Sequence, residues 1–211
     1  MKKKLAAGLL LLALFGLWTV LVRTVDLQII GPQNTAVGLA GVNRWFHGLT
    51  GVNWGLYRLT DWLGLVPVGI CACFGLTGLL QWIRRGSIAR VDRSILALGG
   101  FYLSVMGAFL LFELFPINYR PVLVDGALEA SYPSSTTLLT MCVLPAAALQ
   151  LRARYKDGIG TTIVMGLIAA FTAFMVVARM ISGVHWLTDI VGGLLLSGGL
   201  LFLYWAASGI E

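Results

Sequence analysis

Six apolar stretches, separated by shorter polar segments, occupy most of the 211 residues of the chain. A helix that crosses the hydrocarbon core of a membrane needs about 20 mostly apolar residues, and each stretch is close to that length. The predicted spans are residues 5–22, 62–83, 94–115, 135–150, 160–177 and 189–207. We therefore expect an all-α fold, a polytopic membrane bundle of six transmembrane helices, in which residues 1–211 form one membrane-embedded domain.

The composition excludes other classes of protein. Of the residues, 58% are hydrophobic and 11% are charged, against about 45–50% and roughly 25% in a soluble domain. So few charges cannot cover a surface that faces water, which excludes a soluble globular protein and a disordered one. The 15 Lys and Arg, against 9 Asp and Glu, lie between apolar stretches rather than in one patch, so they indicate membrane topology and not nucleic-acid binding.

The first stretch admits two interpretations. Three lysines precede it, and a charged start before an apolar run is also the pattern of a cleavable signal peptide. The run is long and no small-x-small cleavage site follows it, which favours a retained span.

Basic residues concentrate in alternate connecting segments. Ten of the 15 are Lys2, Lys3, Lys4, Arg84, Arg85, Arg90, Arg93, Arg152, Arg154 and Lys156. Segments rich in Lys and Arg stay in the cytoplasm, so both termini are expected inside. Three segments then face outward, residues 23–61, 116–134 and 179–188.

The first outward segment interleaves Trp45, Phe46, Trp54 and Tyr57 with polar residues. Such aromatic residues belong at the membrane–water boundary. A short amphipathic helix and a loop with aromatic anchors both fit this pattern. His47 has no carboxylate nearby in the sequence, so we interpret it as an interfacial polar residue.

The third outward segment contains a histidine and an aspartate at helical spacing. His185 and Asp189 are four residues apart, so they share one face if the segment is helical. A carboxylate fixes the tautomer of a neighbouring imidazole and favours its cation, which leaves the other ring nitrogen free to attack an electrophile. Arg179 precedes a turn at Gly183 and can fold back onto an anion. The same spacing is also typical of a plain hydrogen bond at a helix start.

The second outward segment combines Arg120 with a predicted helix start. Pro133 followed by small hydroxyl residues predicts that start, where free backbone N–H groups bind anions. Arg120 adds a planar charged donor. Alternatively, Ser134 is a simple N-cap and Arg120 a boundary residue. Together, two arginines, a helix N-terminus and a His–Asp pair on one membrane face predict a phosphate site with a nucleophile.

These residues resemble the motifs of the type 2 phosphatidic-acid phosphatase superfamily of six-span membrane enzymes. The family pattern has three blocks: Lys, six residues and Arg-Pro; then Pro-Ser-Gly-His; then Ser-Arg, five residues, His, three residues and Asp. The matching residues are Arg120-Pro121 in the first block, Pro133-Ser134 in the second, and Arg179, His185 and Asp189 in the third, with Ala178 at the Ser position.

Two positions depart from the family pattern. Glu113 stands where the family has the Lys that helps to bind phosphate, and Thr136 where it has the His that protonates the leaving group. Ser135 replaces the Gly. Because Thr136 cannot act as a general acid near neutral pH, we expect one of two substitutes. Either Glu113 supplies the acid, since partial desolvation raises the pKa of a carboxyl group, or the leaving group is itself acidic, as in a lipid diphosphate.

The resemblance implies a membrane phosphatase of the bacterial cytoplasmic membrane with an outward-facing active site. Its substrate would be a lipid phosphate or diphosphate of the phosphatidate, phosphatidylglycerophosphate or polyprenyl diphosphate type. His185 would form a phosphohistidine, Asp189 would orient and charge it, and Glu113 is the candidate acid. The implied phosphate-binding residues are Arg120, Arg179, Ser134, Ser135 and Thr136.

No metal or other cofactor is implied. The expected partners are the lipid phosphate and membrane lipids, with no nucleic acid and no obligate protein partner. Three other interpretations stay open: a phosphotransferase that uses an acceptor other than water, a non-catalytic protein that binds or transports lipid phosphates, and a structural membrane protein with incidental polar residues. The replacements at Glu113 and Thr136 favour the non-catalytic protein among these.

Overall fold

The structure is a computed structural model that describes residues 1–155 and 158–210. The α-helices in this part of the chain are α1 (Lys2–Thr24), α2 (Ala40–Thr50), α3 (Trp54–Leu63), α4 (Leu65–Arg85), α5 (Arg93–Leu114), α6 (Ser135–Arg154), α7 (Ile159–Ile181) and α8 (Leu187–Ser208). Short elements between them are β1 (Gln28–Ile29), β2 (Ala36–Val37), and the 3₁₀ turns η1 (Pro32–Asn34) and η2 (Ile88–Arg90). Lys156, one of the basic residues used to predict orientation, lies outside the described residues.

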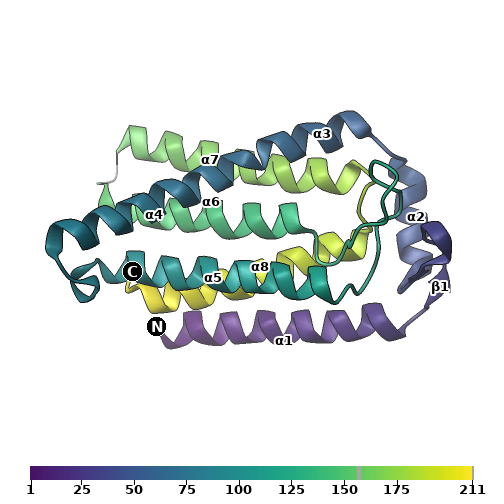
Figure 1. Ribbon diagram of the computed structural model, residues 1–211, viewed down its shortest axis with the longest axis horizontal. Coiled ribbons are helices and arrows are strands. Elements are labelled where there is room, and N and C mark those ends of the chain that lie inside the picture. The colour runs from purple at the N-terminus through teal and green to yellow at the C-terminus, as the bar shows by residue number, and fades with distance from the viewer. Residues whose placement is uncertain (156–157, 211) are drawn as a thin grey trace.

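Six helical segments of the described residues are long and apolar enough to cross a membrane. They are α1, the pair α3–α4, α5, α6, α7 and α8, and they run side by side in Figure 1. This confirms the predicted all-α bundle of six transmembrane segments. The protein is therefore an integral membrane protein.

The second span differs from the prediction at its start. Its helical unit begins at Trp54 instead of residue 62, and it runs through a break at Gly64 to Arg85. Pro67 has no N–H to donate to the carbonyl of Leu63, which explains why the helix is interrupted there. Hydropathy alone assigns α3 to a loop because it carries two charged residues.

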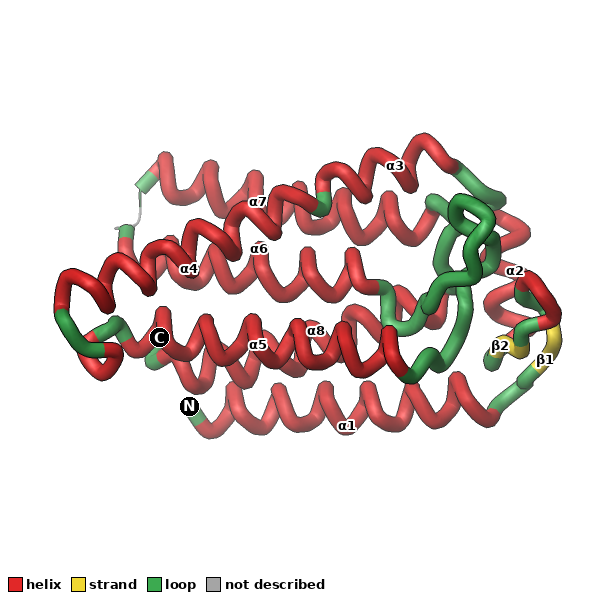
Figure 2. The backbone as a smooth tube through the Cα atoms, viewed as in Figure 1, coloured by secondary structure: helices red, strands yellow, loops and turns green. Residues whose placement is uncertain are grey.

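The two ends of the bundle have different contents. The N-terminus and the end of α8 lie at one end, which we term the terminus end (Figure 1). The opposite end, which we term the site end, carries α2, the β1–β2 pair and the long loop between α5 and α6 (Figure 2). The three segments predicted to face outward thus lie together at the site end.

Helix α8 occupies the centre of the bundle and packs against α1, α5 and α6. Its glycines permit these contacts, because a Cβ on Gly199 would lie 2.7 Å from the side chain of Leu12 and one on Gly192 would lie 2.5 Å from the ring of Tyr132. Other helix glycines are also closely packed: a Cβ on Gly78, Gly193 or Gly198 would lie 3.1 to 3.2 Å from a side chain of a neighbouring helix. A Cβ on Gly75, by contrast, would have no neighbour within 4 Å in the described structure.

The segment after α1 contains a helix, so the helical interpretation is confirmed for residues 40–50 and the loop interpretation is wrong there. Trp45 and Leu49 are exposed on α2, whereas Asn43 is fully buried. The Asn43 amide donates to the carbonyl of Gly38 at 2.9 Å and to the hydroxyl of Thr188 at 3.0 Å. Because Thr188 lies in the first turn of α8, α2 covers the site end of the central helix.

Candidate active site

The connection between α7 and α8 positions three of the predicted site residues. Arg179 lies in the last turn of α7, and a left-handed turn at Gly183, with φ of 69°, follows it. A Cβ on Gly183 would lie 1.7 Å from the carbonyl oxygen of Gly51, so only glycine fits this turn. The turn brings His185 to the start of α8, where its side chain is buried.

His185 and Asp189 lie close together, although not as the sequence suggested. His185 precedes Trp186, the N-cap of α8, so the expectation that both residues sit on one helical face is wrong. The imidazole Nδ1 is 3.8 Å from Asp189 Oδ2, beyond hydrogen-bonding distance. Asp189 instead accepts the backbone N–H of Trp186 at 2.9 Å, so the helix-start hydrogen bond considered as an alternative is also present.

Ser131 occupies the space between the imidazole and the carboxylate. Its Oγ lies 3.0 Å from His185 Nδ1 and donates to Asp189 Oδ2 at 2.5 Å. Asn118 donates to the other carboxylate oxygen at 3.4 Å. Both residues come from the loop between α5 and α6, so this loop and α8 form the polar cluster together.

Arg120 belongs to the same loop and is 8% exposed. Its backbone N–H donates to the Glu129 carbonyl at 3.1 Å, and its Nη2 lies 3.1 Å from the Glu129 carboxylate. The indole of Trp186 donates to the carbonyl of Tyr119 at 2.8 Å. These bonds fix Arg120 beside the connection that carries His185.

The N-terminus of α6 lies against the N-terminus of α8. Ser134 is the N-cap of α6, and its backbone N–H donates to the carbonyl of Asp189 at 3.1 Å. Its hydroxyl accepts the N–H of Thr137 at 3.4 Å. The first-turn N–H groups of Ser135 and Thr136 have no partner within the helix, and the side chains of both residues are half-buried. Ser134 is thus an N-cap beside the candidate site.

Helix α3 holds the second arginine. Arg179 Nη1 donates to the hydroxyl of Thr60 at 3.2 Å and to the carbonyl of Tyr57 at 3.4 Å. The Tyr57 ring lies 4.7 Å from the guanidinium carbon of Arg179 and 5.7 Å from that of Arg120. Both cations therefore lie beside one aromatic ring, which attracts positive charge.

Several buried nitrogens of these residues have no hydrogen-bond partner in the described part of the chain. They are Nε and Nη1 of Arg120, Nε of Arg179 and Nε2 of His185. Arg179 is 1% exposed, and among the described residues it makes no ion pair. A buried cation without an anionic partner is costly, so this arrangement is suited to an anion.

The electrostatic surroundings keep His185 neutral. Burial lowers the pKa of His185 well below its usual value of 6.5, and the positive charges of Arg120 and Arg179 lower it further. A neutral imidazole with a free Nε2 can act as a nucleophile. The expectation that Asp189 favours the cationic form does not describe this resting state.

Glu113 lies at the edge of the cluster, in the last turn of α5. The residue is exposed, so the partial desolvation expected of its carboxyl group is not present. It lines a small cavity together with Ser131 and Ser135. Among the described residues, no group of three or more His, Cys, Asp or Glu side chains is arranged to hold a metal ion.

Sequence reasoning missed five residues that shape the site: His47, Tyr57, Thr60, Asn118 and Ser131. His47 is half-buried and its Nε2 lies 3.1 Å from the carbonyl of Gly183, so its interpretation as a purely interfacial residue is incomplete. No spacing signal links these residues to the motifs; the one clue to Ser131 is its position two residues before Pro133.

Comparisons with known proteins agree with the motifs. Residues 112–209 match the family model of the PAP2 superfamily, and this range includes every site residue predicted from the sequence. The fold is similar to the crystal structure of a transmembrane PAP2-type phosphatidylglycerolphosphate phosphatase from Bacillus subtilis, with a TM-score of 0.54 and 18% identity over 95% of this chain and 94% of that chain. At that identity the likeness establishes the fold alone. No curated protein matches the chain.

Proposed function

Because the chain belongs to the PAP2 superfamily, whose members are phosphatases, we propose that it hydrolyses a lipid phosphate or lipid diphosphate at the site end of the bundle. The observation that carries this proposal is that, among the described residues, the buried guanidinium of Arg179 makes no ion pair and Nε2 of His185 has no hydrogen-bond partner. A phosphate group supplies the negative charge that the arginines need and the electrophile that the imidazole attacks.

The proposed reaction has two steps. His185 Nε2 attacks phosphorus and the bond from phosphorus to the leaving oxygen breaks, which gives a phosphohistidine; water then attacks the same phosphorus and frees the imidazole. Arg120 and Arg179 neutralise the phosphoryl oxygens, whose charge spreads in the transition state. The Ser134 hydroxyl and the N–H groups of Ser135 and Thr136 complete the cradle at the helix N-terminus.

An apolar cavity supports a substrate with a hydrocarbon chain. The cavity, of about 470 Å³, lies between α4, α5 and α6 and begins at Ser135 and Thr136. Its lining is mostly apolar and includes Val68, Met106 and Leu139. The polar side chains that line it are Asp61, Cys71, Tyr102, Ser135 and Thr136. A chain that enters here from the membrane would keep its phosphate at the start of α6.

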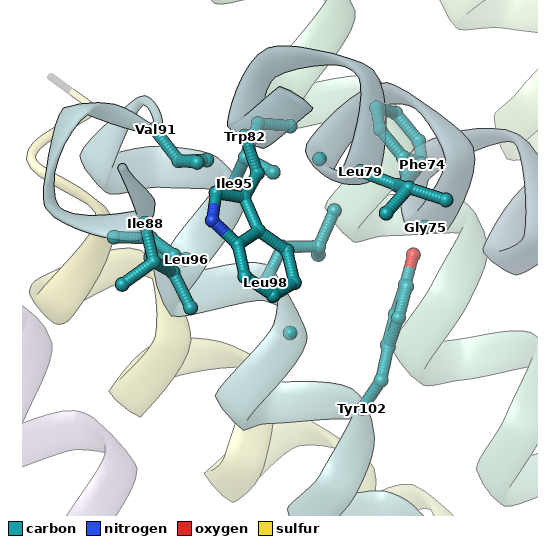
Figure 3. Close-up of a pocket in the computed structure, with 12 residues that line it drawn as sticks. Phe74, Gly75, Leu79, Trp82, Ile88, Val91, Ile95, Leu96, Leu98 and Tyr102 are labelled. Atoms are coloured by element: carbon teal, nitrogen blue, oxygen red, sulfur yellow. The ribbon is translucent and has the colours of Figure 1, made fainter. Parts of the chain in front are cut away.

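A second apolar pocket lies nearer the terminus end, between α4, η2 and α5 (Figure 3). It has a volume of about 280 Å³, and Trp82 and Leu79 line it from α4. Tyr102 of α5 lines both cavities, so together they follow the α4–α5 boundary.

We assign the protonation of the leaving group to Glu113, since Thr136 has no acidic proton to give. The exposed Glu113 carboxyl shares its small cavity with Ser135, the neighbour of Thr136. Glu113→Gln should lower kcat for a lipid phosphomonoester by about 10²-fold and change kcat less for a lipid diphosphate, whose leaving phosphate needs less protonation. Equal turnover of the monoester by Glu113→Gln and the unmodified protein would exclude this role.

The site end faces outward in this proposal, because the basic connecting segments gather at the terminus end and such segments stay in the cytoplasm. The site would then act on lipids of the outer leaflet of a bacterial cytoplasmic membrane.

Phosphate release tests the proposal directly. The purified protein should release phosphate from at least one member of a panel of phosphatidate, phosphatidylglycerophosphate and polyprenyl diphosphate, and His185→Ala should abolish that release. The thermal unfolding midpoint of both proteins controls for folding. Release that persists in His185→Ala would contradict the proposed mechanism.

A second candidate, a non-catalytic protein that binds or transports lipid phosphates, is favoured by the replacements at Glu113 and Thr136. It predicts no phosphate release from any panel member, together with binding of a lipid phosphate that Arg179→Gln weakens.

A further inference from the structure

We propose that Ser131 is a positioning residue that connects His185 to Asp189 and fixes the imidazole as the tautomer with a proton on Nδ1. The inference rests on the proposed function, because it describes the same nucleophile. His185, Asp189 and Ser131 are each at most 3% exposed, so water does not screen their contacts. Ser131 Oγ is within 3.0 Å of both partners, whereas the two partners are 3.8 Å apart.

The available protons determine which group donates in the two hydrogen bonds of Ser131, one with His185 and one with Asp189. The Asp189 carboxylate accepts from the Trp186 N–H on Oδ2 and from the Asn118 amide on Oδ1, so both of its oxygens act as acceptors. The single Ser131 hydroxyl proton is therefore donated to Asp189. Ser131 Oγ then accepts from the imidazole, which places a proton on Nδ1 and leaves the lone pair on Nε2, the nitrogen that has no hydrogen-bond partner in the described part of the chain.

The backbone around Ser131 is held from both sides. Its N–H donates to the carbonyl of Asn118 at 2.9 Å. The following residue, Tyr132, is 1% exposed, and its hydroxyl lies 2.7 Å from that of Thr19 on α1. The Ser131 hydroxyl therefore has little freedom to leave the bridge.

This arrangement keeps the carboxylate from contacting the imidazole directly. In the resting site the imidazole stays neutral, as a nucleophile must. When Nε2 bonds to phosphorus the ring becomes positively charged, its Nδ1–H becomes a stronger donor to Ser131, and Ser131 in turn bonds more strongly to the negative Asp189. Ser131 thus stabilises the charged intermediate without charging the resting imidazole.

Kinetics test the role through variants that remove or weaken the bridge. Ser131→Ala should lower kcat by about 10²-fold and leave KM within about twofold, because Ser131 is proposed to contact the imidazole and not the phosphate. Ser131→Cys keeps the volume but donates and accepts weakly, so it should also lower kcat. Ser197→Ala is the matched control, since Ser197 is equally buried and bonds only to the carbonyl of Leu194 within the described structure.

A second measurement does not need activity. The chain has two histidines, so ¹⁵N-labelled histidine in a His47→Gln background reports His185 alone. We expect a protonated Nδ1 and an unprotonated Nε2, with an Nδ1–H resonance that moves in Ser131→Ala and Ser131→Cys and stays in Ser197→Ala. A proton on Nε2, or an Nδ1–H resonance unchanged in both Ser131 variants, would overturn the inference. Failure of the proposed function would appear separately, as no phosphate release by the unmodified protein.

Discussion

Two arginines at opposite ends of the bundle show how the same side chain serves different purposes. Arg85, at the terminus end, is 42% exposed and pairs with Asp92 at 2.8 Å. Arg179, at the site end, is 1% exposed and bonds only to a hydroxyl and a carbonyl within the described residues. Exposed ion pairs contribute little to stability, whereas an unpaired buried guanidinium persists only where a ligand or a function compensates its cost.

The difference extends to the surroundings of each arginine. Gln81 and Arg85 both donate to Asp92, the N-cap of α5, so the polar groups there satisfy one another. At the site end, Arg120 has one carboxylate contact among the described residues, and two of its nitrogens have no hydrogen-bond partner there. Hydrogen bonding is complete where the fold needs a helix start and incomplete where we propose that phosphate binds.

The largest difference in kcat/KM should appear when each of the two arginines is replaced in turn by a neutral residue. Arg179→Gln should lower kcat/KM by about 10²–10³-fold, the usual cost of removing one charged donor from a phosphoryl site. Arg85→Gln should change kcat/KM by less than about twofold, because exposed pairs are weak. Steady-state hydrolysis by the two variants checks this, and equal losses in both would break the comparison.

A smaller effect, on KM, should distinguish the two apolar cavities along the α4–α5 boundary. Met106→Trp fills the cavity that begins at the site end, so it should raise KM for a short-chain lipid phosphate by about tenfold and leave kcat nearly unchanged. Leu79→Trp fills the other pocket, about 21 Å along α4 from Leu65 at 1.5 Å per residue, beyond the reach of a short chain. Leu111→Trp is the exposure-matched control, as Leu111 is 53% and Met106 55% exposed. If KM rises equally in all three variants, the cavity does not hold the chain.

The smallest effect concerns pH. The unfolded chain binds a proton at His185 near pH 6.5, but the folded protein does not, because its His185 pKa is lowered. The free energy of unfolding should therefore fall as pH drops below about 6.5. By contrast, Asp92, whose pKa is lowered by Arg85 and Gln81, affects stability only below its usual value of 3.8. Unfolding midpoints between pH 7.5 and 5.5 should fall less in His185→Gln than in the unmodified protein, and parallel curves would contradict this.

The spans were predictable because hydropathy dominates a chain of this composition. The start of the second span was predicted too late because α3 carries the charged residues Arg58 and Asp61, which lower its hydropathy, although the helical unit continues from α3 into α4. The aromatic pattern of α2 did not decide between a helix and a loop, because the contact that holds this segment on the bundle joins Asn43 to Thr188, 145 residues away in the sequence.

The site was predictable only where its residues stand at motif spacing. Arg120, Arg179, His185 and Asp189 stand at such positions. Ser131 is 54 residues from His185 and Thr60 is 119 residues from Arg179, and these contacts depend on how the loops fold back over the bundle. The sequence also could not show that Ser131 separates the imidazole from Asp189.

The most direct test of the central claim is capture of the phosphoryl group on the protein. A lipid phosphate labelled in its phosphoryl group, mixed with the purified protein and quenched rapidly in alkali, should leave the label on the peptide that contains His185 and leave none in His185→Ala. Phosphate release without label on that peptide, or label that persists in His185→Ala, would contradict the account.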